Sequence, residues 1–223
     1  RAWIDVKKLV CLIACLGIIS SVPAANALYF PDVKAGSWYY DAVQRASDGG
    51  ILIGDEKGNF SPDKALTRAE SAMILYRLFG KKLEYAFYAE GWQDVPFGSW
   101  YYDAVVNVGI AMGGNYSQPA QAQYDYTWFS PTAPANREDF AVALFNLMGL
   151  EQNGWKYHFN DIDSITWDDG TINNYRQAAC AMANLGIMVG DNNNNFNPQK
   201  SITRAEVAKI VCNLADGGYI ILR

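Results

Sequence analysis

Three arginines stand at the same place in three similar segments, each directly after a residue that favours the start of a helix. The segments are Thr67-Arg68-Ala69-Glu70, Asn136-Arg137-Glu138-Asp139 and Thr203-Arg204-Ala205-Glu206. A cation in the first turn faces the positive end of the helix dipole, which costs roughly 0.3–1 kcal/mol. A guanidinium beside the free N–H groups of a helix start can, however, bind a carboxylate or phosphate. Arg68, Arg137 and Arg204 are therefore predicted to bind an anionic ligand.

Two further residue types recur with these arginines. Tryptophan recurs as Trp38, Trp100 and Trp167, and aspartate recurs as Asp32, Asp94 and Asp161. The tryptophans could stack on sugar rings or anchor the packing between units, and the sequence favours neither role. The aspartates precede a helix, where capping a turn is favoured over contact with a sugar. Each aspartate could also pair with a nearby arginine of this pattern, and such a pair is compatible with orienting the guanidinium for a ligand.

Residues suited to catalysis or metal binding do not occur in a workable pattern. His158 is the one histidine of the chain, which excludes paired-histidine zinc motifs. Residues 191–195 resemble a calcium loop, but Phe196 occupies the glycine position and Ile202 that of the final carboxylate. A carboxylate pair for glycoside hydrolysis stays open, although the recurring acids lie at capping and turn positions. We expect no catalytic residue, no metal and no cofactor.

Helices that begin at the three capping residues must position the arginines. Thr67 and Glu70 have the spacing of a capping box, the last segment repeats it, and Asn136 with Asp139 is a weaker version. Apolar residues follow at helical spacing: Ile74, Leu75, Leu78; Phe140, Ala143, Leu144, Leu147; Val207, Ile210, Val211, Leu214. A shorter helix is predicted over residues 38–46 and a turn-rich loop over residues 54–62. Each unit is thus predicted to be helix, loop, helix.

The chain repeats this unit three times, over residues 28–82, 92–151 and 155–217, and residues 218–223 form a tail. The first unit carries Phe30-Pro31-Asp32-Val33, Trp38-Tyr39-Tyr40-Asp41-Ala42-Val43, Gly50-Ile51 and Phe60-Ser61-Pro62 before its arginine segment. The second unit has a longer loop over residues 113–128, and the third has extra residues over 167–178. One unit has too little apolar surface to fold alone, so the three stripes are expected to meet in a shared core. The predicted fold class is mainly α.

These motifs, in this order, resemble the S-layer homology (SLH) domain, a family that usually occurs in three tandem copies. The resemblance covers residues 28 to about 217 and implies an intramolecular, three-pronged helical bundle with pseudo-three-fold symmetry. It implies that grooves between neighbouring units hold a secondary cell-wall polysaccharide, which in many members carries pyruvate ketals. By motif, the family's binding function falls on the arginines, tryptophans and aspartates named above. Units two and three depart from the family pattern, so some grooves could be inactive.

Composition limits the classes of partner. Half of the 223 residues are apolar, 14% are aromatic and 18% are charged, as in a globular protein with a packed core. The net charge is −5, and it becomes −7 when residues 1–27, with Arg1, Lys7, Lys8 and Asp5, are removed. A nucleic-acid partner is therefore not expected. An anionic polymer can still bind where a few cations are concentrated locally.

The first 27 residues have the pattern of a signal peptide. Lys7 and Lys8 precede an apolar run over residues 9–19, and residues 25–27 form a small-x-small cleavage site. Cys15 within a lipobox-like stretch keeps a lipoprotein open as the alternative, and the true start codon is also open. No later stretch approaches the length of about 20 apolar residues that a membrane helix needs. Cys180 and Cys212 would remain after cleavage, and we expect both to be buried free thiols.

Together these observations predict a secreted, non-catalytic module that holds a protein on the cell wall or S-layer by binding a secondary, peptidoglycan-linked polysaccharide. Two alternatives remain. The same fold could act mainly in lattice self-association through protein contacts, or it could be the anchor of a glycan-active enzyme. The sugars of the polymer, the active grooves and any domain after residue 223 are open at this point.

Overall fold

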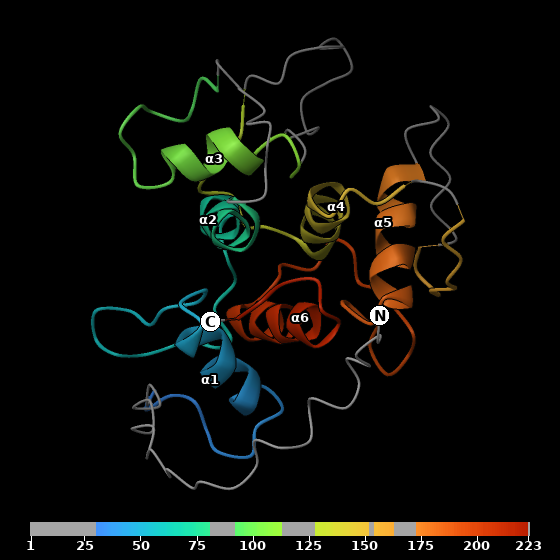
Figure 1. Ribbon diagram of the computed structural model, residues 1–223, viewed down its shortest axis with the longest axis horizontal. Coiled ribbons are helices and arrows are strands. Elements are labelled where there is room, and N and C mark those ends of the chain that lie inside the picture. Colours follow the sequence, from blue (N-terminus) through green and yellow to red (C-terminus); the bar gives the residue numbers. More distant parts are fainter. Residues whose placement is uncertain (1–29, 81–91, 113–127, 152–153, 163–172, 223) are drawn as a thin grey trace, which may run out of the picture.

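The computed structural model describes residues 30–80, 92–112, 128–151, 154–162 and 173–222. Within these ranges the chain is helical, with isolated β-bridges as the only extended pairing (Figure 1). The helices are α1 (Tyr40–Asp48), α2 (Arg68–Phe79), α3 (Tyr102–Val108), α4 (Arg137–Leu147), α5 (Asn173–Asn184) and α6 (Arg204–Asp216). The mainly α fold class is confirmed. The predicted signal peptide and Trp167 lie outside the described residues.

The helices that carry the arginines begin where the capping pattern predicts. Thr67 and Thr203 each accept the backbone N–H of the glutamate three residues later, and that glutamate returns a hydrogen bond to the cap, which completes the capping box. Asn136 caps α4 by accepting the N–H of Asp139, and the shorter Asp139 side chain has another partner. Helix α1 begins at Tyr40, two residues later than predicted, because the N–H of Tyr40 closes a turn on the carbonyl of Ser37 at 3.1 Å.

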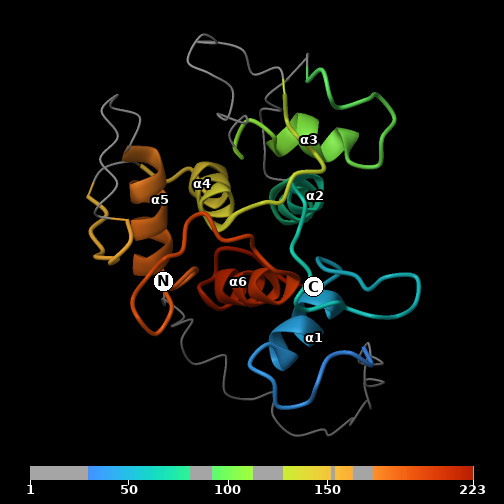
Figure 2. The same cartoon turned by 180° about the vertical axis from the view of Figure 1, so that it is seen from behind.

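Each unit packs its second helix against the first helix of the next unit. The packed pairs are α2 with α3, α4 with α5, and α6 with α1, so the last unit returns to the first (Figures 1 and 2). The predicted apolar stripes are buried or half-buried, and they join one core cluster. Among the arginine-bearing helices, α2 and α4 also make a lesser direct contact. The expectation that the stripes meet one another is therefore right about the shared core and only partly right about the packing partners.

A closed set of backbone hydrogen bonds links the three units just before the caps. Leu66 N–H donates to Ile202 C=O at 3.0 Å, Ile202 N–H donates to Ala135 C=O at 3.0 Å, and Ala135 N–H donates to Leu66 C=O at 2.9 Å. All three side chains are fully buried. The contacts at the centre thus repeat cyclically, whereas the predicted unit boundaries and the pseudo-three-fold arrangement of complete units stay predictions.

The segment after α6 continues the core. Ile220 is buried and Leu222 packs against the cluster close to Gly49, where an added Cβ would lie 3.2 Å from Leu222 Cδ2. The C-terminal end therefore lies beside α1, at the seam between the third and first units (Figure 1).

Candidate functional site at the junctions between units

Each arginine joins its own unit to the next one through a buried phenylalanine. The Nε–H groups donate to phenylalanine carbonyls as follows: Arg68 to Phe129 at 2.8 Å, Arg137 to Phe196 at 2.8 Å, and Arg204 to Phe60 at 2.6 Å. The same guanidinium groups lie over the same rings, 4.8, 5.0 and 4.6 Å from the ring centres. Hydrogen bond and cation–π contact together fix the arginine at the seam.

The aspartates hold the same phenylalanine turns from the other side. Asp32 accepts the N–H of Phe60 at 2.9 Å and that of Ser61 at 2.6 Å. Asp94 and Asp161 make the equivalent pairs of bonds in units two and three. The second residue of each turn has a left-handed backbone, with φ of 57° at Ser61, 60° at Ser130 and 56° at Asn197. The turn-capping interpretation of the aspartates is thus observed in all three units.

The carboxylates beside the arginines are different ones. Arg68 pairs with Asp139 at 3.0 Å, and Arg137 approaches Glu206 at 3.9 Å. No carboxylate of the described residues lies within 4.0 Å of Arg204, whose Nη2 instead donates to the Ile53 carbonyl at 2.6 Å. The alternative in which each arginine pairs with Asp32, Asp94 or Asp161 is therefore wrong, because the neighbouring carboxylates are other residues. The three junctions therefore differ in their ion pairs. Arg68 has a close one, Arg137 has a long one, and Arg204 has none among the described residues.

Burial differs along the same series. The whole residue is 4% exposed for Arg68 and 9% for Arg137, and Arg204 is more open. Burial lowers the pKa of Arg204, and the more distant charges of Glu70 and Asp32 partly offset this. Burial also disfavours the charged form of Asp139, so it raises the pKa of this carboxyl group, and the nearby Arg68 opposes that effect. Since a guanidinium keeps its proton at any physiological pH, Arg204 is a desolvated cation without a close counter-charge among the described residues.

The tryptophans Trp38 and Trp100 present their rings to solvent. Their exposed fractions are 63% and 61%, and each touches the next tyrosine edge-on, at 5.3 Å for Tyr39 and 5.2 Å for Tyr101. A packing anchor would be largely buried, so this exposure argues against that role for both, and it leaves most of each side chain accessible to a ligand. Ile53 and Val189, whose carbonyls receive the bonds from Arg204 and Arg137, are also more than half exposed.

The part of the junction that sequence reasoning missed is the phenylalanine turn as the partner of arginine. Phe60, Phe129 and Phe196 are fully buried. Their recurrence two residues before a proline was visible in the sequence, but the pairing crosses from one unit to the next. Asp32 contacts the turn of its own unit, whereas Arg204 contacts a turn 144 residues away. A pattern within one unit cannot show that two residues so far apart in the sequence are in contact.

The side chains that could ligate a metal ion are dispersed in the described part of the chain. It contains no group of three His, Cys, Asp or Glu side chains able to hold a metal ion. Asp191 accepts the N–H groups of Asn193 at 2.9 Å and Asn195 at 3.0 Å, and the Asn197 side-chain amide at 3.0 Å. These amides lower the pKa of Asp191 to about 2. Cys180 and Cys212 are buried free thiols, as predicted.

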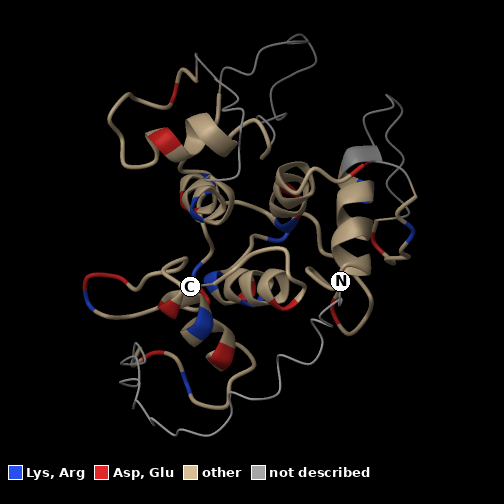
Figure 3. Cartoon of the chain, in the orientation of Figure 1, with Lys and Arg blue, Asp and Glu red and all other residues tan. Residues whose placement is uncertain are grey.

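Charge is spread over the molecule. Acidic and basic residues are scattered along the ribbon, and basic residues at the starts of α4 and α6 lie near the middle (Figure 3). Among the described helices, none has both the length and the apolar character needed to cross a membrane.

Comparison with known proteins supports the repeat pattern. The model of the S-layer homology domain family matches residues 29–72 and 158–208. The S-layer protein of Bacillus thuringiensis subsp. finitimus is 29% identical over 202 residues, which are 87% of this chain and 22% of that protein. The surface-layer 125 kDa protein of Lysinibacillus sphaericus is 31% identical over 88% of this chain and 16% of its own length. An amylopullulanase of Thermoanaerobacterium thermosulfurigenes is 30% identical over 84% of this chain and 9% of its own length.

The chain thus spans about a fifth or less of the curated relatives that it matches. Similarity to surface-layer proteins along most of its length indicates a cell-surface location. The middle unit falls outside the matched regions, yet it makes the same arginine–phenylalanine and aspartate–turn contacts as its neighbours. These matches and the contacts repeated at the junctions place the chain in the S-layer homology domain family.

Proposed function

We propose that this chain is a non-catalytic module that anchors a surface protein by binding an anionic secondary cell-wall polysaccharide at the junctions between its units. The observation that carries the proposal is Arg204, a half-buried cation with no ion-pair partner among the described residues. An anionic substituent of the polymer, such as a pyruvate carboxylate, would supply the missing charge. Arg68 and Arg137 are the equivalent groups at the other two junctions.

The ranking of the junctions follows from their ion pairs. Asp139 already neutralises Arg68 at 3.0 Å, and a ligand there would have to compete with it. Glu206 is 3.9 Å from Arg137 and is also bound to Lys200 at 2.9 Å, so the competition is weaker. At Arg204 no carboxylate of the described residues lies close enough to compete. The junction between the third and first units is therefore proposed as the principal anion site.

Sugar rings would complete the contact through the exposed indoles. A pyranose presents C–H groups that pack against an aromatic face, and the faces of Trp38 and Trp100 are open. Trp167 is proposed as their equivalent in the third unit. Asp32, Asp94 and Asp161 act indirectly, because their carboxylate oxygens hold the turn against which each arginine lies.

Binding to purified cell-wall sacculi tests the proposal. We expect Arg204→Ala to weaken binding by about 10- to 100-fold, since a hydrogen bond to a charged group contributes about 1.5–3 kcal/mol. Lys209→Ala, on the exposed face of the same helix, is the matched control and should bind normally. Arg68→Ala should instead lower stability, by about 3 kcal/mol, because it leaves the Asp139 carboxylate without its partner.

Sacculi stripped of their secondary polymer separate the alternatives. Loss of binding after extraction supports the polysaccharide as partner. Binding that survives extraction would overturn it in favour of peptidoglycan or lattice contacts. Unchanged affinity in the folded Arg204→Ala variant would remove Arg204 from the site, and release of sugars from labelled wall fragments would contradict the non-catalytic role.

A further inference from the structure

A lysine and a glutamate stand together at two of the three junctions. Lys64 Nζ lies 2.7 Å from Glu70 Oε1 in the first unit. Lys200 Nζ lies 2.9 Å from Glu206 Oε1 in the third unit. The other oxygen of each glutamate accepts the backbone N–H of the capping threonine, at 2.9 Å in both units. Both oxygens of each carboxylate thus have a partner in their own unit, which holds the carboxylate back from the arginine of the preceding unit.

The junction between the first and second units has neither of these residues. Ala133 stands at the lysine position and Asp139 at the glutamate position. The Asp139 side chain is one methylene shorter than glutamate, and its Oδ2 lies 3.0 Å from Arg68 Nη1. The protein's own carboxylate therefore occupies the place beside this guanidinium that the anion of a ligand would need.

The backbone at the lysine position is the same in all three units. The N–H groups of Lys64, Ala133 and Lys200 each donate to the carbonyl three residues earlier, at 3.1, 3.0 and 3.1 Å. Their carbonyls accept the N–H of the arginine of the preceding unit, at 3.0, 2.9 and 3.0 Å. The junctions therefore differ in their side chains. Ala133 is partly exposed, so a longer side chain at this position would have access to solvent.

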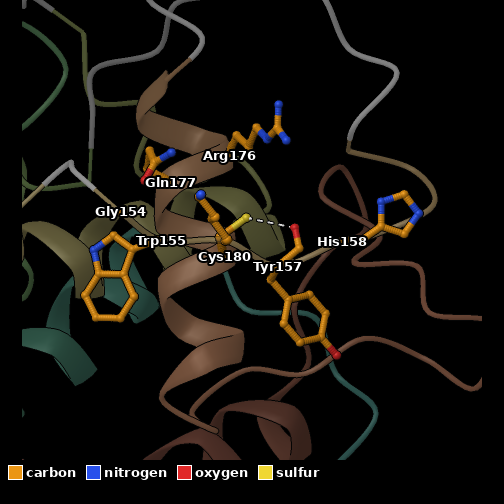
Figure 4. Close-up of a pocket in the computed structure, with 8 residues that line it drawn as sticks. Gly154, Trp155, Tyr157, His158, Arg176, Gln177 and Cys180 are labelled. Atoms are coloured by element: carbon orange, nitrogen blue, oxygen red, sulfur yellow. Dashed lines mark hydrogen bonds between the residues drawn. The ribbon is translucent and has the colours of Figure 1, made fainter.

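The third unit shows how this backbone is held. The Cys180 thiol of α5 donates to the Tyr157 carbonyl at 3.3 Å (Figure 4). A few residues later Asp161 accepts the N–H of Asn197 at 2.6 Å, and the Asn197 carbonyl closes the turn that ends at Lys200. The backbone of Lys200 is thus tied to the segment that α5 fixes, and its exposed side chain is the part able to contact a ligand.

The lysine and the arginine of one junction face the same carboxylate oxygen. Glu206 Oε1 lies 2.9 Å from Lys200 Nζ and 3.9 Å from Arg137 Nη1. An ammonium has three N–H donors, and the Lys200 side chain is 56% exposed. The carboxylate of a ligand could therefore accept charge-assisted hydrogen bonds from both cations at once.

We propose that this lysine is a second ligand-binding cation and that its presence decides which junctions bind an anion. The junctions with Lys64 and Lys200 bind the anionic group of the polymer. The junction of Arg68 does not, because Asp139 closes it. The inference rests on the proposed function in taking that anionic group as the ligand, and it adds the residues that select the junctions.

The Nε–H group of each arginine reports on its own junction, because each donates to a phenylalanine carbonyl there. The probe is a methyl glycoside that carries a pyruvate ketal, and the control is the same glycoside without the ketal. Both are titrated into the full chain and followed by NMR. We expect the acidic probe alone to shift the signals of Arg137 and Arg204, and we expect the Arg68 signal to stay unchanged.

Exchanging two residues should open the closed junction. In the variant with Ala133→Lys and Asp139→Glu, the glutamate can return a hydrogen bond to its cap and the lysine can hold its other oxygen, as in the first and third units. The Arg68 Nε–H signal should then respond to the acidic probe. Asp139→Asn, which keeps the size and removes the charge, should also make Arg68 respond, and it serves if the double variant does not fold.

Removing one lysine tests the second cation. Lys64→Ala should weaken binding of the probe at Arg204 by about fivefold, the effect of one exposed ion pair, and should leave the Arg137 junction unchanged. Lys209→Ala removes the same charge from the exposed face of α6 and should leave both junctions unchanged. Equal effects of the two substitutions would show that Lys64 does not contact the ligand.

The remaining outcomes separate this inference from the proposed function. A response of Arg68 equal to that of Arg204 in the unaltered chain would overturn the inference, and so would an unresponsive Arg68 in the folded variants. Sacculi that bind while no arginine signal responds to the probe would overturn it and leave the anchoring role. Loss of both would overturn the proposed function as well.

Discussion

Two side chains clamp each buried phenylalanine turn at the residue scale. An aspartate from the same unit accepts two turn N–H groups, and an arginine from the preceding unit donates to the turn carbonyl. The middle residue of the turn takes a left-handed backbone that L-residues adopt only when surrounding contacts compensate for its cost. The aspartate is thus a structural support for the position of the arginine.

Asp32→Ala tests this support. We expect it to lower the free energy of unfolding by about 2–4 kcal/mol, because two hydrogen bonds to a charged acceptor are lost and the N–H groups of Phe60 and Ser61 are left unsatisfied. Asp63→Ala, at an exposed position of the same loop, should change stability by less than about 0.5 kcal/mol. Equal and small effects of both substitutions in urea denaturation would show that the carboxylate does not hold the turn.

At the scale of single elements, the helix starts could be predicted because the residues that form a cap are only a few positions apart in the sequence. Thr67 and Glu70 satisfy one another within one turn, and the structure has the capping box where the spacing placed it. The middle unit shows the limit of such reasoning. Asp139 is too short to reach back to its cap, and its carboxylate is instead taken by Arg68 from another unit, 71 residues away.

The loop at residues 191–197 gives a pH-dependent prediction. Amide donors lower the pKa of Asp191 to about 2, so the ionised carboxylate is favoured in the folded loop. Its contribution is present above the ordinary aspartate pKa of about 3.9 and is lost as the pH falls toward 2. NMR titration of the carboxyl carbon should give a midpoint near 2.

Asn197→Gly is the matched variant, because glycine keeps the left-handed backbone and removes the side-chain amide that binds Asp191. The pKa of Asp191 should then rise toward its ordinary value. A midpoint that is the same in both proteins would show that the Asn197 side chain does not stabilise the carboxylate.

At the scale of the whole molecule, the sequence predicted that the three units share one core. It did not predict which helices pack against each other. Amphipathic stripes show that a helix must be buried and do not identify the neighbour that buries it. The neighbour here is always the first helix of the next unit, and α6 closes the set on α1. The exposure of Trp38 and Trp100 was also beyond the sequence, because it depends on which faces the next unit leaves uncovered.

Removing the third unit tests this cyclic packing. A chain that ends at residue 151 lacks the partners of α4 and α1 and leaves the backbone groups of Leu66 and Ala135 without Ile202. We expect no cooperative thermal transition by circular dichroism. Adding a fragment of residues 155–223 should restore one, since the contacts between units are non-covalent. A cooperative transition in the truncated chain alone would show that two units suffice.

The return of α6 to α1 also sets when folding can finish. Arg204 and Phe60 are 144 residues apart, and the seam between them closes only when the last unit is present. Contacts of such long sequence separation slow folding, since the entropy of closing a long loop is lost before the contact stabilises anything. We therefore expect a chain that emerges from its N-terminus to stay incompletely folded until α6 is available to pack against α1. The contacts between the units should then form together in one cooperative step.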